Sequence, residues 1–379
     1  MTSVNNENRI PAFTAAGLPV LIGSVPLADH RRALEWIVDA TPEIPLWPQL
    51  PINPLERMLP QFCEGFPCLV EPAAADEGKR LFFDVTAPEF ESEQLAFFED
   101  YLRVSEDFAA LDNSRFAVGR DRAGGLFLFC ERLADLPGLI AVKGQITGPF
   151  TMLTGITDRR ERLGYYDPAI RDMVVKGLAM KAAWQVRLLA AHTTKPVLLF
   201  IDEPALAGLG SSAFISVSLD DLRRDLSEII EAIHRAGGLA GIHVCANTDW
   251  ELLLGMDPDI LSFDAYGYFD RLAPLRSQVH AYLDRGGIIA WGIVPTSREE
   301  EIMGESAASL VDRWEEQADT LTDDSRDRSA LLAQTLITPS CGTGSLTPDL
   351  ARRVLELTRE VSMLLREKYL EKGAASPGL

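Results

Sequence analysis

One histidine and two cysteines are the residues of this sequence whose types and spacing most directly suggest chemistry. His243 and Cys245 stand two positions apart at the end of the apolar run 239–242, in a chain with only five histidines and five cysteines. In a β-strand, residues i and i+2 point to the same face, so both side chains can be directed at one point. An imidazole nitrogen and a thiolate sulfur are ligands that bind zinc. A buried cysteine beside a hydrogen-bonded histidine would give the same pattern, because free cysteines are often buried.

Cys341 offers a third ligand from a distant part of the chain. It follows the strand-like run 335–337 in the sequence TPSCGTG, whose glycines let the loop turn tightly. One nitrogen and two sulfurs with an open fourth position form the ligand set of a catalytic zinc site. Asp264, which ends the strand-like run 260–263, is a candidate fourth ligand through a carboxylate oxygen. The other cysteines lie outside regular strand ends and are predicted to be packing residues: Cys63, Cys68 and Cys130.

The elements that must position these residues alternate regularly from about residue 138 onward. Short apolar runs alternate with longer amphipathic segments, and this alternation predicts a parallel sheet. The strands are apolar throughout, as a sheet covered on both faces requires. We find no Gly-rich phosphate loop of the Rossmann or Walker type, so a single (β/α)8 TIM barrel is favoured over a doubly wound sheet. In such a barrel the C-terminal ends of all strands face one mouth, where distant residues meet.

The predicted barrel spans residues 17–372, with its first strand within 18–26. Residues 1–16 form an N-terminal arm, and residues 373–379 form a tail. Residues 50–135 fit the alternation poorly, so they are interpreted as an insertion or extension packed on the barrel.

The composition narrows the classes of partner and the compartment. A net charge of −20 argues against nucleic acid and against an anionic membrane surface, since both need a basic face. No uncharged apolar stretch reaches about 18 residues, so no transmembrane helix is expected. The N-terminal sequence lacks the basic and apolar regions of a secretory signal. Five widely spaced cysteines do not suggest a disulfide framework, so we expect a reduced, cytoplasmic protein.

Several short motifs at the strand ends resemble those of one superfamily. They are IGSVP at 22–26, ITGPFTML at 146–153, IDEPAL at 201–206, HVC at 243–245 and TPSCG at 338–342. Over residues 17–30 and 138–372 the chain resembles the zinc-dependent methyltransferase barrels. That superfamily includes the catalytic half of cobalamin-independent methionine synthase, the methylcobamide:coenzyme M methyltransferases and uroporphyrinogen decarboxylase.

The resemblance implies a (β/α)8 barrel that holds zinc through His243, Cys245 and Cys341. Asp264 stands where methionine synthases have a glutamate ligand. The resemblance also implies that Ile22, Ser24 and Asp202 contact homocysteine, with Asp202 pairing with its amine. The expected activity is therefore the transfer of a methyl group to a small-molecule thiol, most directly homocysteine, with coenzyme M as the second choice.

Two departures from the family bear on the methyl donor. The loop WGIVPTSREE at 291–300 has no histidine where the family has its catalytic acid, and no aromatic residue follows GPFT to stack on a pterin. Methyltetrahydrofolate needs its leaving nitrogen protonated, whereas the cobalt of methylcobalamin leaves as Co(I). The departures therefore favour a methylcorrinoid donor, carried on a partner protein. The alternatives are a lyase similar to uroporphyrinogen decarboxylase and a non-catalytic barrel that binds a corrinoid protein.

Overall fold

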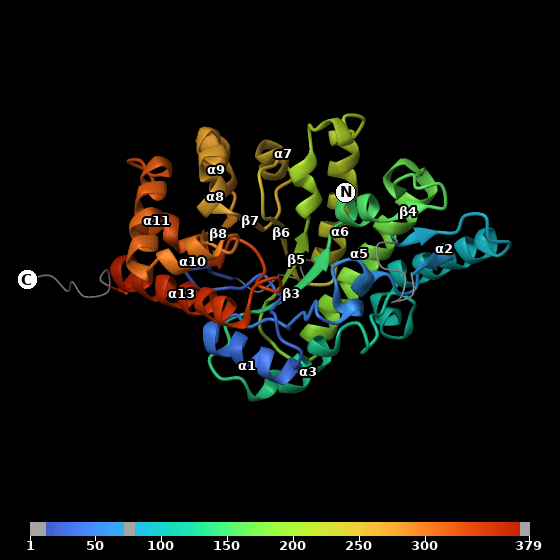
Figure 1. Cartoon of the computed structure of the whole chain (residues 1–379), viewed down its shortest axis with the longest axis horizontal. Helices are drawn as coiled ribbons and strands as arrows, with labels where there is room; N and C mark the ends of the chain where they lie inside the picture. Colours follow the sequence, from blue (N-terminus) through green and yellow to red (C-terminus); the bar gives the residue numbers. More distant parts are fainter. Residues whose placement is uncertain (1–12, 72–79, 372–379) are drawn as a thin grey trace, which may run out of the picture.

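The centre of the molecule is a parallel β-sheet surrounded by helices (Figure 1). The structure is a computed structural model that describes residues 13–71 and 80–371. Six strands pair side by side in chain order: β3 (Val142–Thr147), β5 (Val197–Asp202), β6 (Leu239–Val244), β7 (Ile260–Phe263), β8 (Ile288–Val294) and β9 (Thr335–Pro339). Every pair of neighbours is parallel, as the alternation of strands and helices predicts.

Two extended segments, 18–25 and 43–49, close this sheet into a ring. Three parallel bridges join them to each other and to the two edge strands: Pro19 with Ile337, Ser24 with Gln49, and Leu46 with Lys143. The ring therefore has eight positions in chain order, and the prediction of a single (β/α)8 barrel is confirmed. The two closing segments pair less regularly than the strands because they carry prolines, which cannot donate a backbone hydrogen bond to the sheet.

The helices cover the outside of the barrel and begin where capping residues stand. Asp167 accepts hydrogen bonds from the first turn of α5, which has Pro168 at its first position. The α-helices are α1 (His30–Ala40), α2 (Phe90–Glu106), α3 (Gly124–Arg132), α4 (Pro149–Gly155), α5 (Pro168–Ala190), α6 (Leu219–Arg235), α7 (Trp250–Gly255), α8 (Ala265–Leu272), α9 (Arg276–Asp284), α10 (Glu299–Gly304), α11 (Ala307–Leu321), α12 (Arg328–Ala333) and α13 (Pro348–Arg366). None of the helices within the described residues is long and apolar enough to cross a membrane.

The chain between the second closing segment and β3 adds a layer to one side of the barrel. Its two short strands, β1 (Leu69–Val70) and β2 (Phe82–Phe83), form a small sheet with β4 (Thr157–Asp158), which follows β3 and α4 in the chain. Its longest helix, α2, packs against α5. The stacked rings of Phe66 and Phe97 lie in its core. Two short turns at its start, η1 (Pro54–Glu56) and η2 (Pro60–Phe62), lie near the barrel mouth. Of the predicted arm and tail, residues 1–12 and 373–379 lie outside the described residues.

The barrel interior changes from apolar to polar along the strands. Side chains such as Leu198, Ile260 and Leu336 form a buried apolar cluster near the N-terminal ends of the strands. Towards the C-terminal strand ends the buried side chains are polar: Gln145, Asp202, His243, Ser262 and Thr338. Because a barrel core is normally filled by branched apolar residues, this polar layer marks the end of the barrel where function is expected.

Gln185 of α5 joins the second closing segment to β3. Its Oε1 accepts hydrogen bonds from Trp47 Nε1 at 2.8 Å and from Gln145 N at 3.1 Å. Its Nε2 donates to Gln145 O at 3.1 Å. The adjacent Gly144 leaves room for this amide, since a Cβ there would lie 2.1 Å from Gln185 Oε1. A polar side chain thus replaces part of the regular sheet hydrogen bonding at this edge.

Asp259 ties the end of α6 to the start of two strands. Its Oδ2 accepts hydrogen bonds from His234 Nε2 at 2.6 Å and from Ala240 N at 2.7 Å. The hydrogen bond to Asp259 raises the pKa of His234 above its ordinary value. His234 therefore has a structural role at the N-terminal end of the barrel strands, away from the mouth.

Candidate metal centre and cavity

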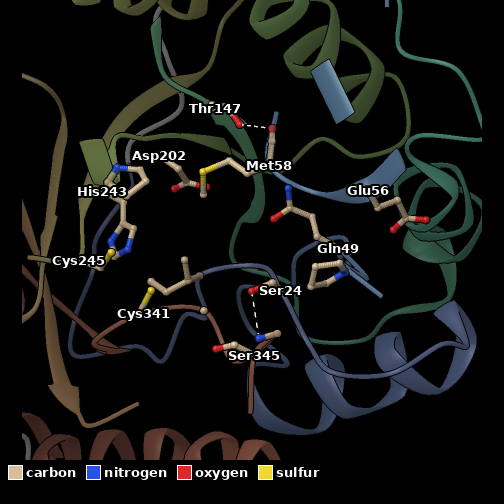
Figure 2. A pocket seen from close by; sticks show the side chains of 15 residues that line it. Ser24, Gln49, Glu56, Met58, Thr147, Asp202, His243, Cys245, Cys341 and Ser345 are labelled. Atoms are coloured by element: carbon tan, nitrogen blue, oxygen red, sulfur yellow. Dashed lines mark hydrogen bonds between the residues drawn. The ribbon is translucent and has the colours of Figure 1, made fainter. Parts of the chain in front are cut away.

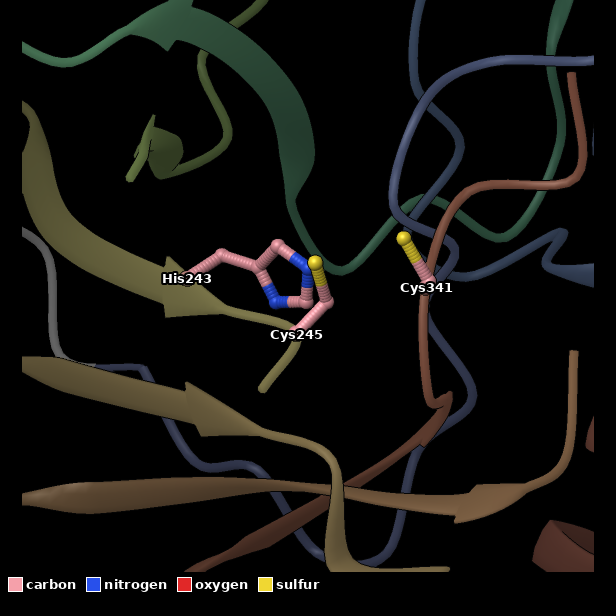
Figure 3. A group of neighbouring side chains, drawn as sticks. All are labelled: His243, Cys245 and Cys341. Atoms are coloured by element: carbon pink, nitrogen blue, oxygen red, sulfur yellow. The ribbon is translucent and has the colours of Figure 1, made fainter. Parts of the chain in front are cut away.

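The structure brings together the three residues that the sequence singles out as metal ligands. His243 lies near the end of β6, Cys245 follows that strand directly, and Cys341 lies two residues after β9. One ligand atom of each side chain lies within 4.8 Å of the other two. Figure 3 shows the imidazole and the two sulfurs facing one shared space. Strands that are not neighbours meet here because their C-terminal ends face the same mouth.

The hydrogen bonding of His243 suits a metal ligand. The side chain is buried, and its Nδ1 lies 2.9 Å from Ser262 Oγ, which can accept a hydrogen bond from Nδ1–H. Its Nε2 is buried without a hydrogen-bond partner among the described residues. Buried polar atoms are rarely left unpaired, and a ligating histidine normally has its second nitrogen held by a neighbouring group. The residues present therefore fit a bound metal ion.

The two cysteines near His243 differ from the cysteines that pack in the protein. The pKa of Cys341 is lowered, first by its interaction with the neighbouring Cys245 thiol and further by His243. The pKa of Cys245 is raised by the same interaction, so the pair favours one thiolate. By contrast, burial raises the pKa of both Cys63 and Cys130 to about 12. Thiolates bind metals, whereas thiols buried in apolar surroundings are inert.

Asp264, the candidate fourth ligand, lies close to this cluster and also caps a helix. Its Oδ1 accepts a hydrogen bond from Gly267 N at 2.8 Å at the start of α8. Burial raises its pKa to about 6, and the charge of Cys341 adds to that rise. Within the described residues, the group of close ligand atoms contains His243, Cys245 and Cys341 without it. Its ligation of the metal stays a prediction.

A cavity of about 310 Å³ opens directly on the three candidate ligands. This volume falls at the lower end of the range for small-molecule sites. The resemblance implicates Ile22, Ser24 and Asp202 in substrate binding, and all three line the cavity. Figure 2 shows Ser24 and Asp202 there. Asp202 is 7% exposed, and its Oδ1 has no hydrogen-bond partner among the described residues. Burial raises the pKa of this carboxyl group to about 6.

The neighbouring carboxylate, Glu203, has a different task. Its Oε1 accepts a hydrogen bond from Phe150 N at 2.9 Å, and its Oε2 accepts one from Thr151 N at 2.8 Å. Thr151 Oγ1 also donates to Oε2, at 2.6 Å. Glu203 thus caps the start of α4, while Asp202 faces the cavity. Of the two adjacent carboxylates in IDEPAL, one is structural and one is available to a ligand.

Sequence reasoning missed several residues of the cavity wall, among them Gln49, Glu56 and Met58. Gln49 lies in the second closing segment, Glu56 in η1, and Met58 between η1 and η2, where no periodic pattern marks them. The Glu56 carboxylate is fully engaged, because it accepts hydrogen bonds from Leu50 N and lies 2.7 Å from His30 Nε2. The sequence NPLE did carry a turn signal, an Asn followed by Pro, but nothing in it indicated a ligand site.

The loop that carries Cys341 is joined to the first closing segment. Thr343 Oγ1 donates to Ser24 O at 2.9 Å, and Gly344 N donates to Ser24 Oγ at 3.2 Å. Ser24 therefore fixes the loop after β9 relative to the cavity, in addition to lining it.

The charges around the cavity are one-sided. Asp202 and Glu56 line it, and its described lining contains no lysine or arginine. Lys143 is fully buried, donates a hydrogen bond to the backbone oxygen of the lining residue Ile22, and lies 4.6 Å from the centre of the Phe200 ring. Burial lowers the pKa of Lys143 to about 8. The cavity is therefore suited to a neutral or cationic ligand.

Comparison with known proteins finds similarity among solved structures only. No protein-family model matches the sequence, and no curated protein matches it. Among solved structures, the chain is similar to a protein from Listeria monocytogenes provisionally assigned as a vitamin-B12-independent methionine synthase. The identity is 17%, the match covers 75% of this chain and 90% of that chain, and the TM-score is 0.45. It is also similar to the 3-keto-D-glucoside 4-epimerase YcjR from E. coli, with 10% identity, coverage of 61% of this chain and 86% of that chain, and a TM-score of 0.34.

Proposed function

We propose that this protein is a zinc-dependent methyltransferase that transfers a methyl group to the thiol of homocysteine. The observation that carries the proposal is the convergence of His243, Cys245 and Cys341 on one wall of a cavity that Asp202 also lines. This arrangement can bind both ends of an aminothiol. A metal ion on the three ligands would hold the thiol, and the Asp202 carboxylate would hold the amine.

Each part of the site has a defined task in this proposal. Zinc, when bound by the three ligands, supplies Lewis acidity that keeps the acceptor sulfur deprotonated at neutral pH. Ser262 holds the His243 ring in the tautomer that leaves Nε2 free. Asp202 receives the acceptor's ammonium group at its unpaired Oδ1 and so orients the sulfur. With a methylcorrinoid as the donor, the acceptor sulfur would form the new bond to the methyl carbon. The carbon–cobalt bond would break, and its electron pair would stay with cobalt.

The charge of the cavity distinguishes between the candidate acceptors. Coenzyme M carries a sulfonate and no amine, and the described cavity lining offers that sulfonate no lysine or arginine. The porphyrinogen substrate of a decarboxylase carries many carboxylates and meets the same difficulty. Homocysteine also carries a carboxylate, but it differs from both in bringing an ammonium group that Asp202 can pair with, which leaves the amino acid without net charge. The electrostatics therefore favour an aminothiol acceptor over both alternatives.

The cavity lining also supports a methylcorrinoid as the donor. His243 is the only histidine among the described lining residues, and no phenylalanine, tyrosine or tryptophan lines the cavity. Tyr266, a possible replacement for the missing acid, donates its hydroxyl to Glu305 Oε1 at 2.9 Å and does not line the cavity. A folate donor would thus meet neither a flat aromatic surface nor a free imidazole.

The test is methyl transfer to homocysteine by the zinc-loaded protein with two donors, methylcobalamin and methyltetrahydrofolate. General acid catalysis contributes about 10²–10⁴-fold to such reactions, so we expect turnover with methylcobalamin and a rate at least about 10²-fold lower with the folate. A preference for the folate would contradict the assignment of the donor. Absence of transfer from either donor would favour a barrel that binds a corrinoid protein without turnover.

A further inference from the structure

The segment of residues 51–62 crosses the edge of the cavity with its backbone fixed at several points. Thr147 Oγ1, at the end of β3, donates a hydrogen bond to Met58 O at 2.6 Å. The buried Glu56 carboxylate accepts from Leu50 N at 3.0 Å. Leu59 packs so closely on α4 that a Cβ at Gly155 would lie 2.3 Å from its Cδ1. The main chain on both sides of Met58 is therefore held in place.

The Met58 side chain is anchored at its backbone and free at its tip. It lines the cavity and is also 41% exposed, so it lies between the cavity and solvent. Figure 2 shows its sulfur-bearing end pointing toward Asp202. Asp202 is the buried carboxylate with an unpaired Oδ1 in this cavity. A methionine has an unbranched, adaptable side chain that fills space without hydrogen bonding.

We propose that Met58 determines which acceptors the cavity takes, by limiting the space around the ammonium group that Asp202 binds. The favoured class is a small thiol with a primary, unsubstituted amine, and a thiol whose nitrogen carries an alkyl chain is rejected by contact with Met58. This inference rests on the proposed function and refines it, since it concerns the shape of the amine subsite and leaves the metal and the donor unchanged.

The test compares homocysteine with N-propylhomocysteine, whose secondary ammonium keeps the positive charge and adds only bulk. Wild-type protein is compared with Met58→Ala, with the volume-conserving Met58→Leu, and with Ile52→Ala. Ile52 belongs to the same segment and is 64% exposed, but it does not line the cavity. Two quantities are measured for each thiol: its affinity, from the sulfur-to-cobalt charge-transfer absorption of the cobalt-substituted protein, and its kcat/KM with methylcobalamin.

The deciding value is the ratio between the two thiols, which cancels any general loss of binding or activity. Steric differences of a few atoms in a pocket are worth about 10–200-fold, so the wild-type, Met58→Leu and Ile52→Ala proteins should prefer homocysteine by at least about tenfold. In Met58→Ala this preference should fall by about tenfold or more. An unchanged ratio in Met58→Ala, or an equal fall in Met58→Leu or Ile52→Ala, would overturn the role of Met58. If no thiol alters the cobalt absorption, the proposed thiol methyltransferase function itself fails. That outcome differs from an unchanged ratio, which contradicts only the role of Met58.

Discussion

Replacement of Asp202 by asparagine tests how the cavity recognises its acceptor. The substitution keeps the size of the side chain and removes its charge. Asp202 Oδ1 has no hydrogen-bond partner among the described residues, so the change breaks no internal hydrogen bond of that atom. The expected loss is that of one charge-assisted hydrogen bond to an ammonium group, about 1.5–3 kcal/mol. At 1.36 kcal/mol per tenfold change, this corresponds to a fall of roughly 10- to 150-fold in kcat/KM for homocysteine.

The informative comparison is with 4-mercaptobutanoate, which has the carbon chain, carboxylate and thiol of homocysteine but no amine. Asp202→Asn should leave the kcat/KM of this thiol nearly unchanged. Glu203→Gln is the matched control, because Glu203 is the adjacent buried carboxylate and caps α4 instead of facing the cavity. It should affect both thiols equally. If Asp202→Asn weakens both thiols alike, then Asp202 acts on the metal or on the fold, and the recognition of the amine is wrong.

Metal content, packing and pH dependence provide three further tests. Protein purified without chelator should hold about one zinc per chain by elemental analysis. Cys245→Ser should lose most of this zinc, and Cys130→Ser should keep it. Equal zinc in both variants would contradict the ligand assignment. Gly144→Ala should lower the free energy of unfolding in urea by about 1–3 kcal/mol, since its methyl group would lie 2.1 Å from a buried amide oxygen. Gly304→Ala, with no atom within 4 Å of the added carbon, should have little effect. The hydrogen bond that raises the pKa of His234 above 6.5 contributes stability that is fully present below about pH 6.5 and is lost as the pH rises through the folded-state pKa. In urea unfolding across this range His234→Gln should lack that decline, and an unchanged pH dependence would refute the linkage.

The regular part of the fold could be predicted because each element carries its own local signal. The start of α5, for example, is specified by Asp167 and Pro168, which cap and begin the helix. Strand ends are equally visible, because a polar residue such as His243 stands out at the end of an apolar run. Once a barrel is assumed, its topology brings those ends to one mouth. The convergence of His243, Cys245 and Cys341 could therefore be predicted from the sequence.

The opposite wall of the cavity was not predictable in the same way. Gln49 and Met58 belong to a part of the chain where prolines interrupt the strand and short turns replace helices. Their positions depend on tertiary contacts such as the hydrogen bond from Thr147 Oγ1 to Met58 O. A glutamine and a methionine in such a segment do not indicate a binding site. The segment has no helical or strand periodicity, so the sequence predicts only a loop. The first strand was predicted within residues 18–26, and the segment 18–25 takes that place in the barrel, although its pairing rests on isolated bridges.

The buried charges at the mouth give an independent reason to expect a cation there. Cys341 favours the thiolate form, and the Asp202 carboxyl group lies in the same cavity with an unpaired oxygen. Burying anionic groups without compensation is costly, and the cost falls when an opposite charge is fixed beside them. The ammonium group of Lys143 donates a hydrogen bond to Ile22 O. It does not line the cavity beside these anionic groups. A dication held by His243, Cys245 and Cys341 would supply the missing positive charge. Because it binds the folded protein, added zinc should raise the thermal unfolding temperature. If the three side chains only pack in the core, added zinc should leave that temperature unchanged.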